Sequence, residues 1–242
     1  GTQNTAVGSL ALDANTTADA NTAIGYSALS ANTTGANNTA VGVSSLTSCT
    51  GSSNTAFGHQ AGANATTASN NVFLGRDAGI TGSPGGNVTT SGGILVLGDE
   101  NISAAHIQVS FTVASDKRDK TDVEPVKMGL DFVNKLEPVT YKWDKRSLYV
   151  EKGEDFNDIV PDGSHKEDWL DVGFLAQDVE KLESEYGYNI SDKTNLTTDI
   201  SENGEQYGLT YSKFVPMLVK AVQELSTQVD ELKAQIQTLK ED

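Results

Sequence analysis

Five stretches in the first third of the chain repeat one pattern of apolar, small and polar residues. They read NTAVGSLAL, NTAIGYSAL, NTAVGVSSL, NTAFGHQAG and NVFLGRDAG, and they begin at residues 4, 21, 38, 54 and 71. Their central glycines are spaced 17, 17, 16 and 17 residues apart, and an apolar residue precedes each one. A disordered linker does not hold apolar residues in register, so the pattern predicts a structural repeat.

This period is too short for a pair of helices and fits two short strands with two turns. Thr, Val, Ile and Phe favour strands, and Gly and Asn favour turns with positive φ. Each repeat offers about one sizeable apolar residue, at the position before its glycine; these are Val7, Ile24, Val41, Phe57 and Leu74. A single chain would then bury far less than ordering its backbone costs, at ~1–2 kcal/mol per residue. We therefore expect several copies to share one core, as in a trimeric β-roll or β-solenoid.

The pattern changes after the fifth repeat. Residues 80–93 are rich in glycine and serine and predict a loop or a weaker repeat. Residues 94–113 alternate apolar and polar positions, with apolar side chains at every second position from Ile107 to Val113, which predicts a strand. This strand runs directly into the charged stretch VASDKRDKTDVEP.

Beyond Ser115 the pattern predicts an α+β domain. Pro125 in a first turn, with TDVE before it as a capping box, indicates a short helix over 125–136. Polar residues over 144–168 indicate a surface excursion. The other predicted elements are a strand over 138–143, a strand entering an amphipathic helix over 172–182, and a strand followed by a helix from 207 to the end.

Seven apolar residues of the last helix are spaced alternately four and three residues apart. They are Leu218, Val222, Leu225, Val229, Leu232, Ile236 and Leu239. This heptad spacing is typical of a coiled coil, and the alternative is an amphipathic helix packed on its own domain. β-branched residues at a with Leu at d favour two strands in parallel coiled coils, but we expect three because the repeat region imposes its own symmetry.

Charge also divides the chain near its midpoint. Residues 1–114 hold five acids and one base, whereas residues 115–242 hold the other 28 acids and 16 bases. We therefore predict a repetitive β-structured region at 1–114, an α+β domain at 115–212 and a C-terminal helix or coiled coil at 213–242.

The composition also excludes several classes of partner and site. A net charge of −16 disfavours nucleic acid and anionic lipid as direct partners, because both bind basic surface. No apolar run approaches the ~20 residues that cross a bilayer, so we expect no membrane insertion. Cys49 is the single cysteine, the three histidines lack metal-ligand spacing, and residues 80–93 lack a P-loop lysine. We therefore expect no disulfide within the chain, no metal and no cofactor.

Three blocks of the second half carry a resemblance to a known family. They read VASDKRDKTDVEPVKMGLDFVNKLEPVTYKW, VGFLAQDVEKL and YGLTYSKFVPMLVKAVQELSTQVDELK. In content and order they resemble the C-terminal intramolecular chaperone autoprocessing domain, a self-cleaving peptidase family of phage tail spikes, tail fibres and endosialidases. The repeats of residues 1–79 are similar to those of tail-fibre shafts and of trimeric adhesin heads.

The resemblance implies assembly followed by self-cleavage. In this family the domain trimerises, guides the folding of a β-structured shaft and then cuts itself off. The family motif Ser-Asp-x-Arg-Leu-Lys stands here as Ser115-Asp116-Lys117-Arg118-Asp119-Lys120. The motif implies that Ser115 is the nucleophile and Lys120 the general base, with Asp116 and Arg118 in support. The implied cut falls between Ala114 and Ser115.

The chemistry itself requires an activated serine. A serine hydroxyl is a poor nucleophile until a neighbour takes its proton, and an amine can do so only when it is neutral. Burial or nearby positive charge favours the neutral amine, and Lys117 or Arg118 can supply such charge. Asp119, which replaces the family's Leu, acts against it. The reaction runs once per chain, so we expect a single-turnover peptidase with no external substrate.

Together these expectations describe the C-terminal region of a homotrimeric phage tail fibre or tail spike. Its shaft belongs to the virion, and its chaperone domain acts in the host cytoplasm during assembly. A receptor or glycan on the host surface is the partner expected of the shaft or of domains upstream of it. The alternative is a trimeric adhesin stalk or spacer on a bacterial surface, whose C-terminal domain assembles it without cleavage.

Overall fold

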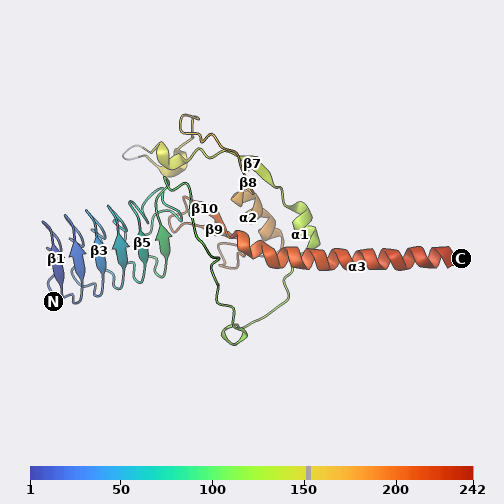
Figure 1. Ribbon diagram of the computed structural model, residues 1–242, viewed down its shortest axis with the longest axis horizontal. Helices are drawn as coiled ribbons and strands as arrows, with labels where there is room; N and C mark the ends of the chain where they lie inside the picture. Colours follow the sequence, from blue (N-terminus) through green and yellow to red (C-terminus); the bar gives the residue numbers. More distant parts are fainter. Residues whose placement is uncertain (151–153, 242) are drawn as a thin grey trace. The chain divides into compact units, whose positions relative to one another are not determined.

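The computed structural model describes residues 1–150 and 154–241 and begins with a solenoid of six parallel strands. The strands stand side by side in sequence order, and each is hydrogen-bonded to the next (Figure 1). They are β1 (Thr5–Val7), β2 (Thr22–Ile24), β3 (Thr39–Val41), β4 (Thr55–Phe57), β5 (Val72–Leu74) and β6 (Leu95–Leu97). The predicted β-solenoid is confirmed, and residues 80–93 form the loop before the last strand.

The register of the sequence repeat is also the register of the sheet. Ala40 pairs with Ala23 on one side and with Ala56 on the other. The glycine after each strand permits this stacking: Gly42 has a φ of +139°, and a Cβ there would lie 2.2 Å from the carbonyl oxygen of Gly58. Only a residue without a side chain allows neighbouring coils to approach so closely.

The core of the solenoid does not consist of the apolar residues before the glycines. Successive side chains of a strand point to opposite faces, so the middle residue of each triplet faces inward and its neighbours face outward. The buried residues include Ala23, Ala40, Ala56, Phe73 and Val96, together with Leu12, Leu29 and Leu46 from the following turns. In contrast, Val7, Ile24, Phe57 and Leu74 are exposed. The expectation that a single chain buries almost nothing is therefore wrong, because small side chains let each narrow coil close around its own core.

The fifth coil shows how this core keeps its volume. Phe73 stands where the preceding coils have alanine, and it is fully buried. Its ring occupies the space that Gly62 and Gly79 leave open, at positions where earlier coils carry Leu29 and Leu46. A Cβ at Gly79 would lie 2.4 Å from Cδ1 of Phe73. Phe73 thus replaces the alanine of earlier coils, and the two glycines replace their leucines, so that the space inside the coil stays closely packed.

A ladder of asparagines runs along the inside of the solenoid. Its fully buried members are Asn21, Asn38, Asn54 and Asn71. The Oδ1 atom of Asn21 accepts the backbone N–H of Asn38 at 2.9 Å, and the Oδ1 of Asn38 accepts that of Asn54 at 2.9 Å. Each amide nitrogen donates to a backbone carbonyl, as Asn38 does to Gly51 at 2.8 Å. The ladder therefore satisfies backbone groups that would otherwise be buried without partners.

The described residues form two compact units. The first contains those within 1–105, 142–169 and 200–207, and the second those within 106–141, 170–199 and 208–242. The three-domain division predicted from sequence stays a prediction, because these units reflect contacts and not independent folding.

The second unit is an α+β region, as predicted. Its elements are α1 (Leu130–Lys135), β7 (Val139–Tyr141), β8 (Asp171–Gly173), α2 (Ala176–Glu185) and α3 (Phe214–Glu241), with β9 (Thr198–Ile200) and β10 (Tyr207–Leu209) at its border. Strand β7 pairs antiparallel with β8, and β9 pairs with β10. The core consists of Met128, Phe132, Val179, Leu182, Phe214 and Met217.

Two predicted elements are shorter than the sequence suggested. The helix expected over 125–136 begins at Leu130, and its first turn is capped not by TDVE but by Glu224 of α3, whose Oε2 accepts the Leu130 N–H at 2.7 Å. The strand expected over 94–113 ends at Leu97. Residues 101–125 are exposed throughout, and within the described part of the chain no strand pairs with 104–113.

The excursion expected over 144–168 contains two short 3₁₀ helices in the described part, η2 (Arg146–Leu148) and η3 (Phe156–Asp158), while residues 151–153 lie outside the described residues.

Candidate functional site

The predicted motif forms a tight turn around a single 3₁₀ helix, η1 (Lys117–Asp119). Asp116 is its N-cap, and its carboxylate accepts the backbone N–H of Arg118 at 2.9 Å. The Arg118 guanidinium also binds this carboxylate, with Nη2 at 2.6 Å from Oδ2 and Nε at 3.1 Å from Oδ1. Aspartate is favoured at this position because it satisfies a free N–H of the first turn.

The turn brings the two predicted catalytic side chains together. Nζ of Lys120 donates a hydrogen bond to Oγ of Ser115 at 2.7 Å. The backbone N–H of Lys120 donates to the carbonyl oxygen of Lys117 at 3.3 Å, which closes the turn between them. This separation lies within the range in which a proton can pass between a nucleophile and its base.

Asp116 and Arg118, the predicted supporting residues, shift each other's pKa. Hydrogen bonds from the side chain and then the backbone of Arg118 lower the pKa of Asp116, and the bond to Asp116 raises the pKa of Arg118. The charge of Arg118 is thus balanced by Asp116. Arg118 therefore orders the turn, and it is not a free positive charge beside Lys120 as the sequence suggested.

Within residues 1–150 and 154–241, no part of the chain buries the candidate site. Residues 101–125 are all exposed. The apolar side chains leading into the site are among them, with Ile107 at 53%, Val109 at 72%, Phe111 at 77% and Val113 at 81% exposure. Alternating apolar and polar side chains in an extended segment are typical of a strand with one buried face.

The predicted coiled-coil seam is also exposed. Helix α3 packs on its own unit through its N-terminal part, where Phe214, Met217 and Ala221 are buried and Glu224 accepts the Leu130 N–H, whereas every residue from 225 to 241 is exposed. The alternative of an amphipathic helix packed along its own domain is therefore wrong for this part of α3. Its seven apolar seam residues, Leu218, Val222, Leu225, Val229, Leu232, Ile236 and Leu239, are all at least 40% exposed.

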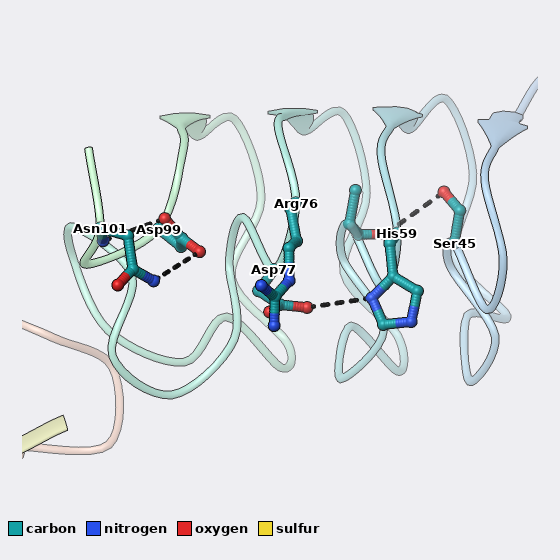
Figure 2. Close-up of polar contacts among 7 residues, drawn as sticks. Ser45, His59, Arg76, Asp77, Asp99 and Asn101 are labelled. Carbon is teal, nitrogen blue, oxygen red and sulfur yellow. Dashed lines mark hydrogen bonds and ion pairs between the residues drawn. The ribbon is translucent and has the colours of Figure 1, made fainter. Parts of the chain in front are cut away.

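Other polar clusters in the solenoid have structural explanations. Asp77 lies between two basic side chains, with Arg76 Nε at 2.9 Å and His59 Nδ1 of the preceding coil at 3.4 Å (Figure 2). Asp99 folds back on Asn101, whose backbone N–H and side-chain amide both donate to it at 3.0 Å (Figure 2). Within residues 1–150 and 154–241, no group of His, Cys, Asp and Glu side chains could hold a metal ion. None of the helices in this described part is long and apolar enough to span a membrane.

The sequence did not single out two carboxylates that make several hydrogen bonds in the structure. Glu183 of α2 is fully buried, and its Oε1 accepts both the N–H and the hydroxyl of Thr197 at 2.7 Å. Glu202 accepts hydrogen bonds from residues 89–91, more than 100 positions earlier in the chain. Neither carboxylate belongs to a motif, and nothing local distinguishes it from the many other acids of the second half.

One of three comparisons with known proteins gave a match. Residues 115–188 match the model of a peptidase family described as Chaperone of endosialidase. The match begins at Ser115 itself, the residue that Lys120 contacts. No curated protein and no solved structure gave a significant match. Residues 115–188, which follow the N-terminal β-solenoid, are thus similar to the chaperone-of-endosialidase family, for which self-cleaving peptidase activity is implied in general.

Proposed function

We propose that this chain is the C-terminal region of a phage tail fibre or tail spike that assembles as a homotrimer and then cuts itself between Ala114 and Ser115. The contact of 2.7 Å between Lys120 Nζ and Ser115 Oγ, at the first residue of the family match, is the observation that carries the proposal. The products are a solenoid shaft and a released chaperone.

The cut proceeds as an intramolecular acyl transfer. Lys120, as the neutral amine, takes the hydroxyl proton of Ser115, and Oγ attacks the carbonyl carbon of Ala114. The peptide C–N bond then breaks, and the protonated lysine returns the proton to the leaving nitrogen of Ser115. Water hydrolyses the resulting ester, which leaves a carboxylate on Ala114 and a free amine and hydroxyl on Ser115. Because nucleophile and carbonyl belong to adjacent residues, their effective concentration is high.

Assembly provides the condition that this chemistry needs. A solvated lysine stays protonated at neutral pH, whereas burial favours its neutral form. The apolar side chains from Ile107 to Val113 are exposed directly before the dyad. Packing this segment against other copies of the chain would remove water from Ser115 and Lys120, so that cleavage follows assembly and does not precede it.

Two exposed apolar surfaces support association of copies. One is the row of residues before the solenoid glycines, where Val7 pairs with Ile24 and Phe57 with Leu74 in successive coils. The other is the seam of α3, whose 28 residues extend over about 42 Å at 1.5 Å per residue. A seam held at heptad spacing and left exposed fits neighbouring copies of the same helix.

Cleavage after folding has a physical benefit. Before the cut, the folding of chaperone and shaft is one coupled equilibrium, in which the coiled coil raises the effective concentration of the three chains. After the cut, an unfolded shaft lacks the element that brought its copies together. The shaft is then stabilised kinetically, because it cannot refold by the same route.

Intact mass measurement of the purified chain tests the cleavage. We expect fragments of residues 1–114 and 115–242 from the natural sequence and an intact chain from Ser115→Ala. Lys120→Arg keeps the charge but cannot act as a base, so it should also remain intact, whereas Lys166→Ala, which removes an exposed lysine outside the motif, should cleave normally. An intact natural chain in a correctly assembled oligomer would show that the proposed peptidase function is wrong.

A second candidate function is a trimeric adhesin stalk or spacer assembled without cleavage. It is favoured by the exposure of both members of the dyad and by Asp119, which lies next to the base and carries the opposite charge. Binding of host-surface glycans by residues 1–105, with the chain still intact, would support this alternative.

A further inference from the structure

A ladder of threonines runs along one corner of the solenoid. The backbone N–H of Thr50 donates to the carbonyl oxygen of Thr66 in the next coil at 2.7 Å, and that of Thr66 donates to Thr89 at 2.7 Å. The hydroxyl groups repeat the pattern, from Thr50 to the Thr66 carbonyl at 3.1 Å and from Thr66 to the Thr89 carbonyl at 3.0 Å. Thr50 and Thr66 thus each offer two donors to a carbonyl of the following coil.

At Thr89 the ladder reaches its last coil, and a carboxylate takes the place of the next carbonyl. The N–H of Thr89 donates to Oε2 of Glu202 at 3.0 Å, and its hydroxyl donates to Oε1 at 3.0 Å. The N–H of Thr90 donates to Oε1 at 3.0 Å and that of Ser91 to Oε2 at 3.2 Å. The Thr90 hydroxyl also donates to Oε1.

The segment that carries Glu202 is held in shape by its own hydrogen bonds. The N–H of Ser201 donates to the carbonyl of Gln206 at 2.8 Å, and the Ser201 hydroxyl accepts the Gln206 N–H at 2.9 Å. Ser201 itself is buried against Gly86, where a Cβ would lie 2.7 Å from that of Ser201. The carboxylate is therefore presented by a formed loop that fits the end of the solenoid.

A second segment after the proposed cut also contacts this region. Nζ of Lys145 donates to the carbonyl oxygen of Glu100 at 2.8 Å. Ser147 lies against Gly82, where a Cβ would be 2.8 Å from the serine Cβ. Residues 142–169 and 200–207 belong to the same compact unit as the solenoid, although the predicted boundary places them in the chaperone domain.

We propose that residues 200–207 are the terminal cap of the solenoid, with Glu202 as the positioning residue that ends its threonine ladder. The cap lies C-terminal to Ser115, so the released fragment remains bound to the shaft through this contact after the backbone is cut. That the cut fragment stays bound to the shaft rests on the proposed function, whereas the capping of the solenoid by residues 200–207 does not. Release then requires a second, non-covalent step.

The protonation of Glu202 agrees with this geometry. Burial alone would raise its pKa, but hydrogen bonds from Thr90, Thr89 and Ser91 lower it from 4.5 to about 2. The carboxylate is therefore ionised at neutral pH, and the N–H and hydroxyl groups around it bind the charged form.

The cap is tested by hydrogen exchange in the full chain carrying Ser115→Ala, so that cleavage plays no part. Glu202→Gln keeps the side-chain length but turns an NH₂ group toward the donors. We expect exchange at residues 89–91 to rise by about 10-fold to 100-fold, while protection of β3 is unchanged. Asp199→Asn is the matched control, because it removes the same charge from an exposed site in the same hairpin. Equal exchange at 89–91 in both variants would overturn the cap.

Retention is tested with a specific protease site inserted between Ala114 and Ser115 in the same uncleavable chain. After cutting, the two fragments should co-elute on gel filtration, and with Glu202→Gln they should separate. Separation in the parent chain, or co-elution that Glu202→Gln leaves unchanged, would overturn retention by this contact. Failure of the natural chain to cut itself would overturn the proposed peptidase and not the cap.

Discussion

Replacing Asn38 by alanine should open the solenoid locally. In the folded chain, Oδ1 of Asn38 accepts the backbone N–H of Asn54 at 2.9 Å, and Nδ2 donates to the carbonyl of Gly51 at 2.8 Å. Both backbone groups belong to buried residues, so Asn38→Ala leaves the Asn54 N–H without this acceptor and the Gly51 carbonyl with only the weak thiol donor of Cys49 at 3.8 Å. Each such loss costs about 1–3 kcal/mol, which gives about 2–6 kcal/mol for the variant.

Native-state hydrogen exchange at β3 and β4 measures this change without interference from the second unit. A loss of about 2–6 kcal/mol corresponds to protection lowered by about 30-fold to about 20,000-fold. Asn64→Ala is the control, because Asn64 is exposed and bonds only another side chain, that of Asn87, at 3.0 Å. We expect it to cost within about 1.5 kcal/mol. If Asn38→Ala lowers protection no more than Asn64→Ala does, the asparagine ladder does not stabilise the coils as argued.

Three further predictions concern the stacking of coils, the seam and the cap. Gly42→Ala places a Cβ 2.2 Å from the Gly58 carbonyl oxygen, so it should destabilise the solenoid. The control is Gly85→Ala, because Gly85 has a φ of +79° but open space around it, and this variant should be less destabilised. Equal unfolding midpoints of the two variants in urea would contradict this. Leu232→Asp puts a charge in the α3 seam and should reduce the oligomer to smaller species in sedimentation, whereas the same aspartate at Ala234, outside the seam, should leave the mass unchanged. Because the folded pKa of Glu202 is about 2 against an ordinary 4.5, the stability of the cap is fully present above pH 4.5 and is lost as pH falls through about 2. Exchange at residues 89–91, corrected for the intrinsic rate, should follow that window, and a pH-independent protection would contradict it.

The sequence predicted the parts of this protein that local patterns encode. The spacing of glycines fixed the coil length because every coil must meet its neighbour at the same close approach, as Gly42 meets Gly58. The heptad spacing from Leu218 to Leu239 placed the long helix and its apolar seam, because helical periodicity is a local property. Two of the three blocks that carried the family resemblance overlap the match to the family model, which covers residues 115–188.

The tertiary structure alone decided which side chains face the core. The pattern drew attention to the larger residue before each glycine, yet the narrow coil has room inside only for alanine, as at Ala40, or for phenylalanine opposite two glycines, as at Phe73. Inside and outside depend on how the chain closes on itself in three dimensions. Amino-acid composition does not show which side chains this closure places inside.

The same holds for contacts between distant residues. Lys120 lies five positions after Ser115, a spacing that by itself does not indicate a contact between the two side chains. The turn capped by Asp116 brings them within hydrogen-bonding distance. Glu202 meets Thr89 across 113 positions, and Glu224 caps a helix 94 positions away. No local pattern marks these acids, because their partners are free backbone N–H groups that come within reach only once the chain has folded.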